Sequence, residues 1–91
     1  MPEKYSREEI LTMVKNQLGE ILEIDPSSVN ESDSYVDDLN ADSFALIELV
    51  EALEEELGEK APGFRIEDED LEDLMTVRDS VDYIFDKVNT D

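Results

Sequence analysis

The sequence predicts an all-α fold: a small four-helix bundle with three main helices, one short helix and a long first loop. Over most of the chain, apolar residues recur at steps of three and four, which is the period of amphipathic helices. No segment shows the alternation of apolar and polar residues that is typical of a half-buried strand. A chain of 91 residues has the length of one small domain, so we expect residues 1–91 to form a single domain.

The first helix is predicted to begin at Ser6. This residue and Glu9 have the spacing of a capping box, in which each side chain bonds the other residue's backbone. The apolar stripe that follows consists of Ile10, Met13, Val14, Leu18, Ile21 and Leu22. Gly19 marks either a close contact or the end of this helix. Asp25 and Pro26 then predict a turn or a very short helical start, because proline is tolerated at the first helical position.

Residues 25–42 are predicted to form a long loop, since Asp, Ser, Asn and Pro are dense there. The predicted anchors of this loop in the core are Val29, Tyr35, Val36 and Leu39. Loops of this length are unusual in so small a domain and are generally functional or disordered.

The second helix is the clearest in the sequence. Residues 43–57 contain no Gly and no Pro, and Gly58 is well placed to end the helix. Its apolar stripe is Leu46, Leu49, Val50, Leu53 and Leu57. Five glutamates take the remaining surface: Glu48, Glu51, Glu54, Glu55 and Glu56.

The last third of the chain predicts a loop, a short helix and a final helix. The Pro62-Gly63 pair indicates a flexible loop over residues 59–65, and Ile66 anchors an acidic short helix within residues 67–74. Thr76 and Asp79 have the spacing of a second capping box. The helix that they open carries Val77, Val81, Ile84, Phe85 and Val88.

The net charge of −20 is the strongest compositional signal. Nucleic acid and anionic membrane surfaces repel such a chain, so we expect partners with basic patches, or cations, and no nucleic acid. Fourteen acidic residues and no basic residue lie between Asn16 and Glu59. No apolar run approaches the roughly 18 residues of a membrane span, and residues 1–5 do not begin a signal peptide. Because the chain also lacks Cys, the expected location is the cytoplasm.

The absence of Cys and His excludes several function classes. The chain can form no disulfide, no thiolate nucleophile, no histidine triad and no histidine-bound metal site. Asp68, Asp70, Glu72 and Asp79 have part of the spacing of a calcium loop, but Asp73 stands where that loop needs Gly. The sequence therefore predicts no dedicated metal site; loose cation binding and a plain solvated acidic surface remain as alternatives.

The junction between the long loop and the second helix is the best candidate site. A simple interpretation of Ser43 is that it, or Asp42, caps the helix. The hydroxyl of Ser43 would also stand at the positive end of the helix dipole, where a phosphate group meets free backbone N–H groups. The chain supplies no base that activates this hydroxyl, so we expect another protein to carry out the chemistry on it.

Residues 38–44, Asp-Leu-Asn-Ala-Asp-Ser-Phe, and residues 48–56, Glu-Leu-Val-Glu-Ala-Leu-Glu-Glu-Glu, resemble the acyl carrier protein family. The family pattern is Asp-Leu-Gly-Ala-Asp-Ser-Leu, followed by a helix of the form Glu-Leu-Val-x-Ala-Leu-Glu-Glu-Glu. The resemblance covers nearly the whole chain, since residues 33–39 look like the family's approach to the serine and residues 76–84 like its last helix.

The resemblance implies a carrier protein and not an enzyme. Ser43, next to the motif residue Asp42, would receive 4′-phosphopantetheine from coenzyme A. A magnesium-dependent holo-acyl carrier protein synthase, a phosphopantetheinyl transferase, would attach it. The thiol of that arm would carry acyl groups as thioesters, which accounts for a working thiol in a protein without Cys.

The resemblance also implies a docking face, an acyl pocket and a monomeric protein. Acyl-synthesis enzymes with basic patches would dock on Phe44, Ile47, Glu48, Glu51, Glu54 and Glu55. The pocket would be lined by Tyr35, Leu46, Leu53, Leu71, Leu74 and Tyr83, although a plain core predicts the same residues.

Several positions depart from the family pattern. Asn40 replaces Gly, Phe44 replaces Leu, Ala45 stands where an acid is common and Glu51 where Met is common, and residues 58–65 lengthen a connection. Fatty acid synthesis is the leading expectation, and these departures keep a specialised carrier, for example in polyketide synthesis, close behind it as the alternative. The competing hypothesis is an acidic adaptor or cation-binding module without a prosthetic group, which has no need for the Asp42–Ser43 pair.

Overall fold

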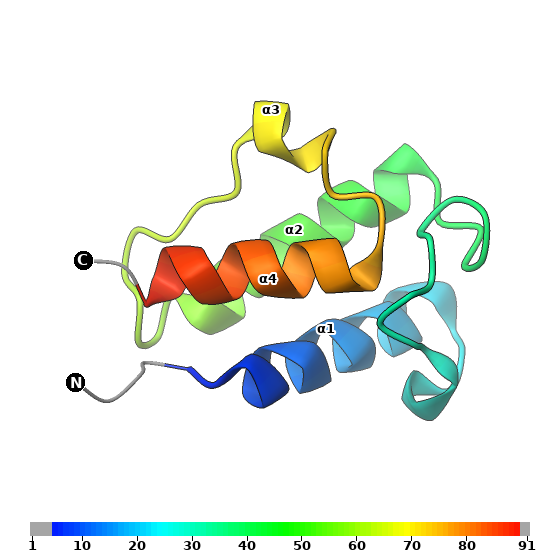
Figure 1. The fold of residues 1–91 in the computed structure, drawn as a ribbon, viewed down its shortest axis with the longest axis horizontal. Coiled ribbons are helices and arrows are strands. Elements are labelled where there is room, and N and C mark those ends of the chain that lie inside the picture. The colour runs from blue at the N-terminus through cyan, green and yellow to red at the C-terminus, as the bar shows by residue number, and fades with distance from the viewer. Residues whose placement is uncertain (1–4, 90–91) are drawn as a thin grey trace.

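The computed structural model describes residues 5–89, except the side chain of Asp68 (Figure 1). Its elements are α1 (Arg7–Leu22), the 3-10 turn η1 (Pro26–Ser28), α2 (Ser43–Leu57), α3 (Asp68–Leu71) and α4 (Val77–Val88). The described residues contain no strand, and one isolated bridge joins Ser34 to Thr76. The predicted fold class, with three main helices, one short helix and a long first loop, is confirmed.

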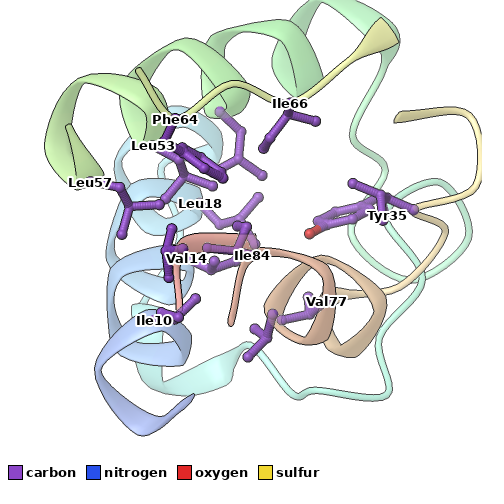
Figure 2. Packing of buried hydrophobic residues seen from close by; sticks show 14 of the residues in the cluster. Ile10, Val14, Leu18, Tyr35, Leu53, Leu57, Phe64, Ile66, Val77 and Ile84 are labelled. Atoms are coloured by element: carbon purple, nitrogen blue, oxygen red, sulfur yellow. The ribbon is translucent and has the colours of Figure 1, made fainter. Parts of the chain in front are cut away.

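The three long helices pack around one apolar core. α1 contacts both α2 and α4 and runs in the opposite direction to them, while α3 lies on the far side of α2 and α4 from α1 (Figure 1). Figure 2 shows side chains from all three long helices converging. The most deeply buried of them are Ile10, Val14, Leu18, Leu53, Leu57, Val77, Val81 and Ile84. The predicted apolar stripes therefore supply the core.

Both predicted capping boxes are present, at Ser6 with Glu9 and at Thr76 with Asp79. α1 does not end at Gly19 but continues to Leu22, followed by Glu23 with a left-handed φ of 56°. Gly19 instead marks a close contact, because a Cβ there would lie 2.7 Å from Cγ of Pro26. The glycine allows η1 to pack against α1.

The long loop is anchored by Val29 and Tyr35, which are buried, and by Leu39, which is half-buried. The prediction that Val36 is an anchor is wrong, since 61% of this residue is exposed. Residues 34–38 form a turn, closed by a hydrogen bond from the Asp38 N–H to the Ser34 carbonyl oxygen. In that turn Tyr35 points inward and its neighbour Val36 points outward.

Backbone hydrogen bonds fix the long loop to the start of α4. The N–H of Tyr35 donates to the carbonyl oxygen of Met75 at 3.1 Å, and the N–H of Val77 donates to that of Asp33 at 3.1 Å. These bonds hold the loop in an ordered position immediately before α2.

Arg7 adds a side-chain link between α1, the loop and α4. Its guanidinium lies 2.6 Å from Glu31 and 2.8 Å from Asp82. Hydrogen bonds to these two carboxylates raise the pKa of Arg7 above its ordinary value.

Hydrogen bonds also join the beginning and the end of the described chain. The side-chain amide of Asn89 donates to the Tyr5 carbonyl oxygen at 3.0 Å, and the N–H of Tyr5 donates to Oδ1 of Asn89 at 3.4 Å.

The short helix α3 covers only the four residues Asp68–Leu71 of the segment 67–74 in which it is predicted. Its N-cap, Glu67, makes no side-chain capping bond, and the acidic residues Glu72 and Asp73 at its end oppose the helix dipole. The chain continues in tight turns, with the Leu74 N–H donating to the Leu71 carbonyl oxygen. None of the helices within residues 5–89 is long and apolar enough to cross a membrane.

Candidate functional site: an exposed serine beside an apolar hollow

Asp42, and not Ser43, caps α2. Oδ1 of Asp42 accepts a hydrogen bond from the Ala45 N–H at 2.9 Å. Ser43 is then the first residue of the helix, and it is exposed. Its hydroxyl has no hydrogen-bond partner among the described residues. The two interpretations of the junction are thereby separated: the aspartate holds the helix end and the serine hydroxyl stays free to react.

Asn40 makes the turn that leads into this helix start. Its φ is 54°, a left-handed conformation that Asn tolerates better than most residues with a side chain. After the turn, Ala41 is buried and its N–H donates to the Tyr35 carbonyl oxygen at 2.7 Å. The departure from glycine at position 40 therefore leaves the approach to Ser43 intact.

An open hollow of about 450 Å³ lies beside Ser43. The loop, α2, α3 and the segment before α4 line it with Tyr35, Val36, Ser43, Leu46, Ile47, Leu71, Glu72, Leu74 and Met75. Seven of these nine side chains are apolar or aromatic, so the hollow suits an apolar chain better than a polar ligand. A free hydroxyl at the rim and an apolar hollow beside it fit a group that is linked to Ser43 through phosphate and carries an acyl chain.

Four of the six predicted pocket residues line this hollow: Tyr35, Leu46, Leu71 and Leu74. The structure does not bring the other two to it. Leu53 is buried among the long helices (Figure 2). Tyr83 lies at a separate hollow, where its hydroxyl donates to Oδ2 of Asp70 at 2.7 Å and accepts from Nζ of Lys87 at 2.9 Å.

Tyr35 forms the inner wall of the hollow. Its ring reaches from the loop into the core with the hydroxyl foremost (Figure 2), and only 2% of the residue is exposed. The hydroxyl donates to Oγ of Ser80 on α4 at 2.6 Å. Burial raises the pKa of Tyr35 to about 12, so the group stays neutral at physiological pH.

The exposed large apolar side chains of the described residues are Val36, Phe44, Ile47 and Met75, and three of them line the hollow. Phe44, the fourth, directly follows Ser43 and is 69% exposed, so it does not fold back into the core. The sequence does not indicate the exposure of Met75, and the prediction that Val36 is buried is wrong, because both residues lie in loops where no periodicity shows which side faces solvent. Their exposure beside a hollow is typical of a contact surface.

The glutamates of α2 differ in their surroundings. Glu48, Glu51 and Glu55 are exposed. Glu54 is half-buried, and one of its carboxylate oxygens accepts a hydrogen bond from the Ile66 N–H at 2.9 Å. The predicted docking residues therefore share one helix, but Glu54 also fastens the connection between α2 and α3.

A second hollow of about 450 Å³ adjoins the hollow beside Ser43. It shares Ile47 and Leu71 with the hollow beside Ser43 and is otherwise lined by Val50, Glu51, Glu54, Arg65, Ile66 and Glu67. Its rim is charged, and Ser43 does not reach it. Within residues 5–89, acidic side chains do not gather into a group that could hold a metal ion.

Residues 13–84 match the protein-family model described as "Phosphopantetheine attachment site". The chain belongs to the acyl carrier protein family. The protein named "Acyl carrier protein" from Thermosynechococcus vestitus is 43% identical over 91% of this chain and 96% of its own length. Those from Thermotoga maritima and Acidothermus cellulolyticus are 46% and 42% identical, each over 87% of this chain.

Family membership decides between the carrier and the adaptor without a prosthetic group. The chain is an acyl carrier protein, hence a partner of enzymes and not an enzyme, and its cofactor is 4′-phosphopantetheine. When bound, this group supplies the thiol on which acyl groups are carried as thioesters.

Proposed function

We propose that Ser43 is the residue to which 4′-phosphopantetheine is attached. The supporting observation is its free, exposed hydroxyl at the first position of α2, at the rim of an apolar hollow. In the transfer, Ser43 Oγ forms a bond to phosphorus, the pyrophosphate bond of coenzyme A breaks, and adenosine 3′,5′-bisphosphate leaves. The serine proton goes to the magnesium-dependent holo-acyl carrier protein synthase, because this chain offers no base beside the hydroxyl.

Asp42 acts in this proposal as a positioning residue. Its carboxylate is engaged with the Ala45 N–H, which fixes the start of α2 at Ser43. The dipole of α2 then favours a phosphate on the serine side chain.

The attachment is tested by intact mass before and after incubation with coenzyme A and a promiscuous phosphopantetheinyl transferase. The protein should gain one phosphopantetheine, and fragment masses should place it on Ser43. Ser43→Ala should gain nothing while its helical circular dichroism stays unchanged. Ser32→Ala, which alters another exposed serine, is the matched control and should be modified as the wild type is. Modification of Ser43→Ala would disprove the assignment.

The docking face proposed for partner enzymes begins beside Ser43 and runs along α2 to Glu55. It comprises the predicted residues Phe44, Ile47, Glu48, Glu51, Glu54 and Glu55, to which the structure adds Val36 and Met75. Exposed apolar side chains near the arm would supply binding energy, and the glutamates would attract basic patches and set the rate of encounter. Brief, salt-sensitive contacts suit a carrier that must visit several enzymes in turn.

The hollow beside Ser43 is the proposed resting place of the acyl chain. Its apolar lining removes methylene groups from water, which favours uptake of the chain between visits to enzymes. Tyr35, Leu46, Leu71 and Leu74 are the predicted pocket residues that contribute, together with Val36, Ile47 and Met75.

We favour fatty acid synthesis as the pathway, with polyketide or another specialised acyl pathway as the alternative. The relatives described above carry only the name "Acyl carrier protein". The alternative rests on the departures at Asn40, Phe44, Ala45 and Glu51 and in residues 58–65. Comparing turnover with a fatty acid ketosynthase and a polyketide ketosynthase tests it. A monomeric state, checked by native mass, and a cytoplasmic location stay predictions.

A further inference from the structure

We propose that Tyr35, held by Ser80, is the wall that limits the length of acyl chain this carrier takes up. The inference rests on the proposed attachment at Ser43 and assigns a specificity role within the hollow beside it. Three contacts place Tyr35 for this role. The residue lines the hollow, its hydroxyl donates a hydrogen bond to Ser80 on α4, and its backbone N–H and carbonyl oxygen bond Met75 and Ala41.

The position of Tyr35 makes it a barrier between the hollow and the core. Beyond its hydroxyl lies α4, whose residues Val77, Val81 and Ile84 are fully buried. Tyr35 stands between the hollow that it lines and these side chains, because its hydroxyl reaches Ser80 on the helix that carries them. A longer chain can therefore extend toward the core only if the Tyr35 ring moves.

The Tyr35–Ser80 hydrogen bond opposes that movement. Ser80 is buried, and the bond to it is short, at 2.6 Å. If an acyl chain displaced the ring, methylene groups would replace a hydroxyl partner, and a buried hydroxyl would lose its hydrogen bond. Ser80 thus acts as a positioning residue that pins the wall.

The polar pair joins the loop to α4 where backbone hydrogen bonds already hold these two segments together. A phenylalanine at position 35 and an alanine at position 80 would satisfy the same packing without any buried polar atom, which is generally the cheaper solution. A hydroxyl pair beside an apolar hollow instead holds the Tyr35 ring in place while an acyl chain enters and leaves the hollow.

The experiment loads the protein with a series of acyl groups and measures uptake by thioester protection. A promiscuous phosphopantetheinyl transferase transfers butanoyl, hexanoyl, octanoyl, decanoyl and hexadecanoyl phosphopantetheine from the corresponding coenzyme A thioesters. Cleavage by hydroxylamine is then timed for each form. Each methylene that enters the hollow should slow cleavage about fourfold, and the effect should stop at the chain length that reaches Tyr35.

The informative variants are Tyr35→Phe, Ser80→Ala and the double variant Tyr35→Phe/Ser80→Ala. We expect all three variants to raise the chain length at which the slowing of cleavage stops, which is the plateau. The double variant should raise it by no more than the sum of the two single effects. Tyr83→Phe is the matched control, because it removes a hydroxyl at a separate hollow and should keep the wild-type plateau.

Two other outcomes would overturn the proposal. If the pair had only a structural role, the variants would lower the thermal midpoint of unmodified protein and leave the plateau unchanged. If Leu71→Ala moved the plateau and the Tyr35 and Ser80 variants did not, the limiting wall would be Leu71 on α3, which lines both hollows. A failure to load any acyl group onto the wild type would instead contradict the attachment site, so the two failures are distinguishable.

Discussion

A carboxylate oxygen of Glu54 accepts a hydrogen bond from the backbone N–H of Ile66 at 2.9 Å, which ties the middle of α2 to the segment that leads into α3. The neighbouring glutamates Glu51 and Glu55 are exposed. Charge on α2 therefore has two roles, since the carboxylates of Glu54 and Glu56 accept hydrogen bonds from other segments while Glu51 and Glu55 face solvent.

Replacing Glu48 should separate docking from stability. Glu48→Lys should slow modification by the holo-acyl carrier protein synthase about fivefold at low salt, because an exposed charge mainly sets encounter rate. The effect should shrink as salt is raised. Glu8→Lys, which makes the same charge change at the exposed start of α1, is the control and should change the rate much less. Equal slowing by both variants would assign the effect to net charge alone.

Replacing Glu54 should give a different pattern. Glu54→Lys removes the acceptor of the Ile66 N–H, so it should lower stability by about 1 kcal/mol in addition to slowing modification. Urea unfolding measures the first effect. Glu54→Gln keeps an acceptor oxygen and should retain most of the stability, whereas an unchanged midpoint in Glu54→Lys would contradict a stabilising role for the bond.

Phe44→Leu should raise turnover by a generic fatty acid ketosynthase at equal acyl load. Phe44 is 69% exposed beside Ser43, so its bulk meets any enzyme that approaches the arm. Ala45 is unsuited to the same test because its side chain is buried, and an acid there would also perturb the core. An equal or lower rate with Phe44→Leu would mean that the phenylalanine does not encode a specialised partner.

Stability should fall in strong alkali because Tyr35 is buried as a neutral phenol. Its pKa is raised from 10.0 to about 12, so its contribution is complete below pH 10 and is lost as the pH rises through 12. A shift of this size corresponds to about 3 kcal/mol. Urea unfolding across this range should show a shallower loss for Tyr35→Phe than for the wild type. Parallel curves would show that ionisation of Tyr35 is not coupled to folding.

Gly19→Ala should destabilise the protein by about 1–2 kcal/mol. A Cβ would lie 2.7 Å from the Pro26 side chain and 3.0 Å from the Ile24 carbonyl oxygen, so η1 must shift. The higher helix propensity of Ala offsets about 1 kcal/mol of that cost. Gly58→Ala is the comparison variant. Its added Cβ would lie 3.0 Å from a helix carbonyl oxygen and would meet no loop residue. A more stable Gly19→Ala variant would show that the contact between positions 19 and 26 has room for a methyl group.

Much of the fold follows from local patterns in the sequence. Ser6 with Glu9 and Thr76 with Asp79 place the helix starts because capping is decided within four residues. The bounds of α2, residues 43–57, are predicted correctly because the apolar stripe runs without Gly or Pro up to Gly58. The burial of Ala45 is not predicted, because it lies outside that stripe. The sequence does not decide where α1 ends, because the role of Gly19 depends on the contact that Pro26 makes with it after the chain has turned back.

The site was predictable where a short motif defines it and not where the tertiary fold does. Asp42 and Ser43 are adjacent in the chain, and their division of roles needs only the geometry of a helix start. The walls of the hollow come from four separate segments, so Leu53 and Tyr83 were grouped with it although they lie elsewhere. Val36 and Met75 lie in loops, where side-chain direction depends on hydrogen bonds to distant backbone.

The links from α1 to α4 have a consequence for synthesis of the chain on the ribosome. Arg7 pairs with Asp82, and Tyr5 pairs with Asn89, so contacts that close the fold join its earliest and latest described residues. α1 and α2 cannot complete the core before α4 has left the exit tunnel, so native folding waits for α4. During that interval the acidic stretch between Asn16 and Glu59 keeps nascent chains apart by mutual repulsion.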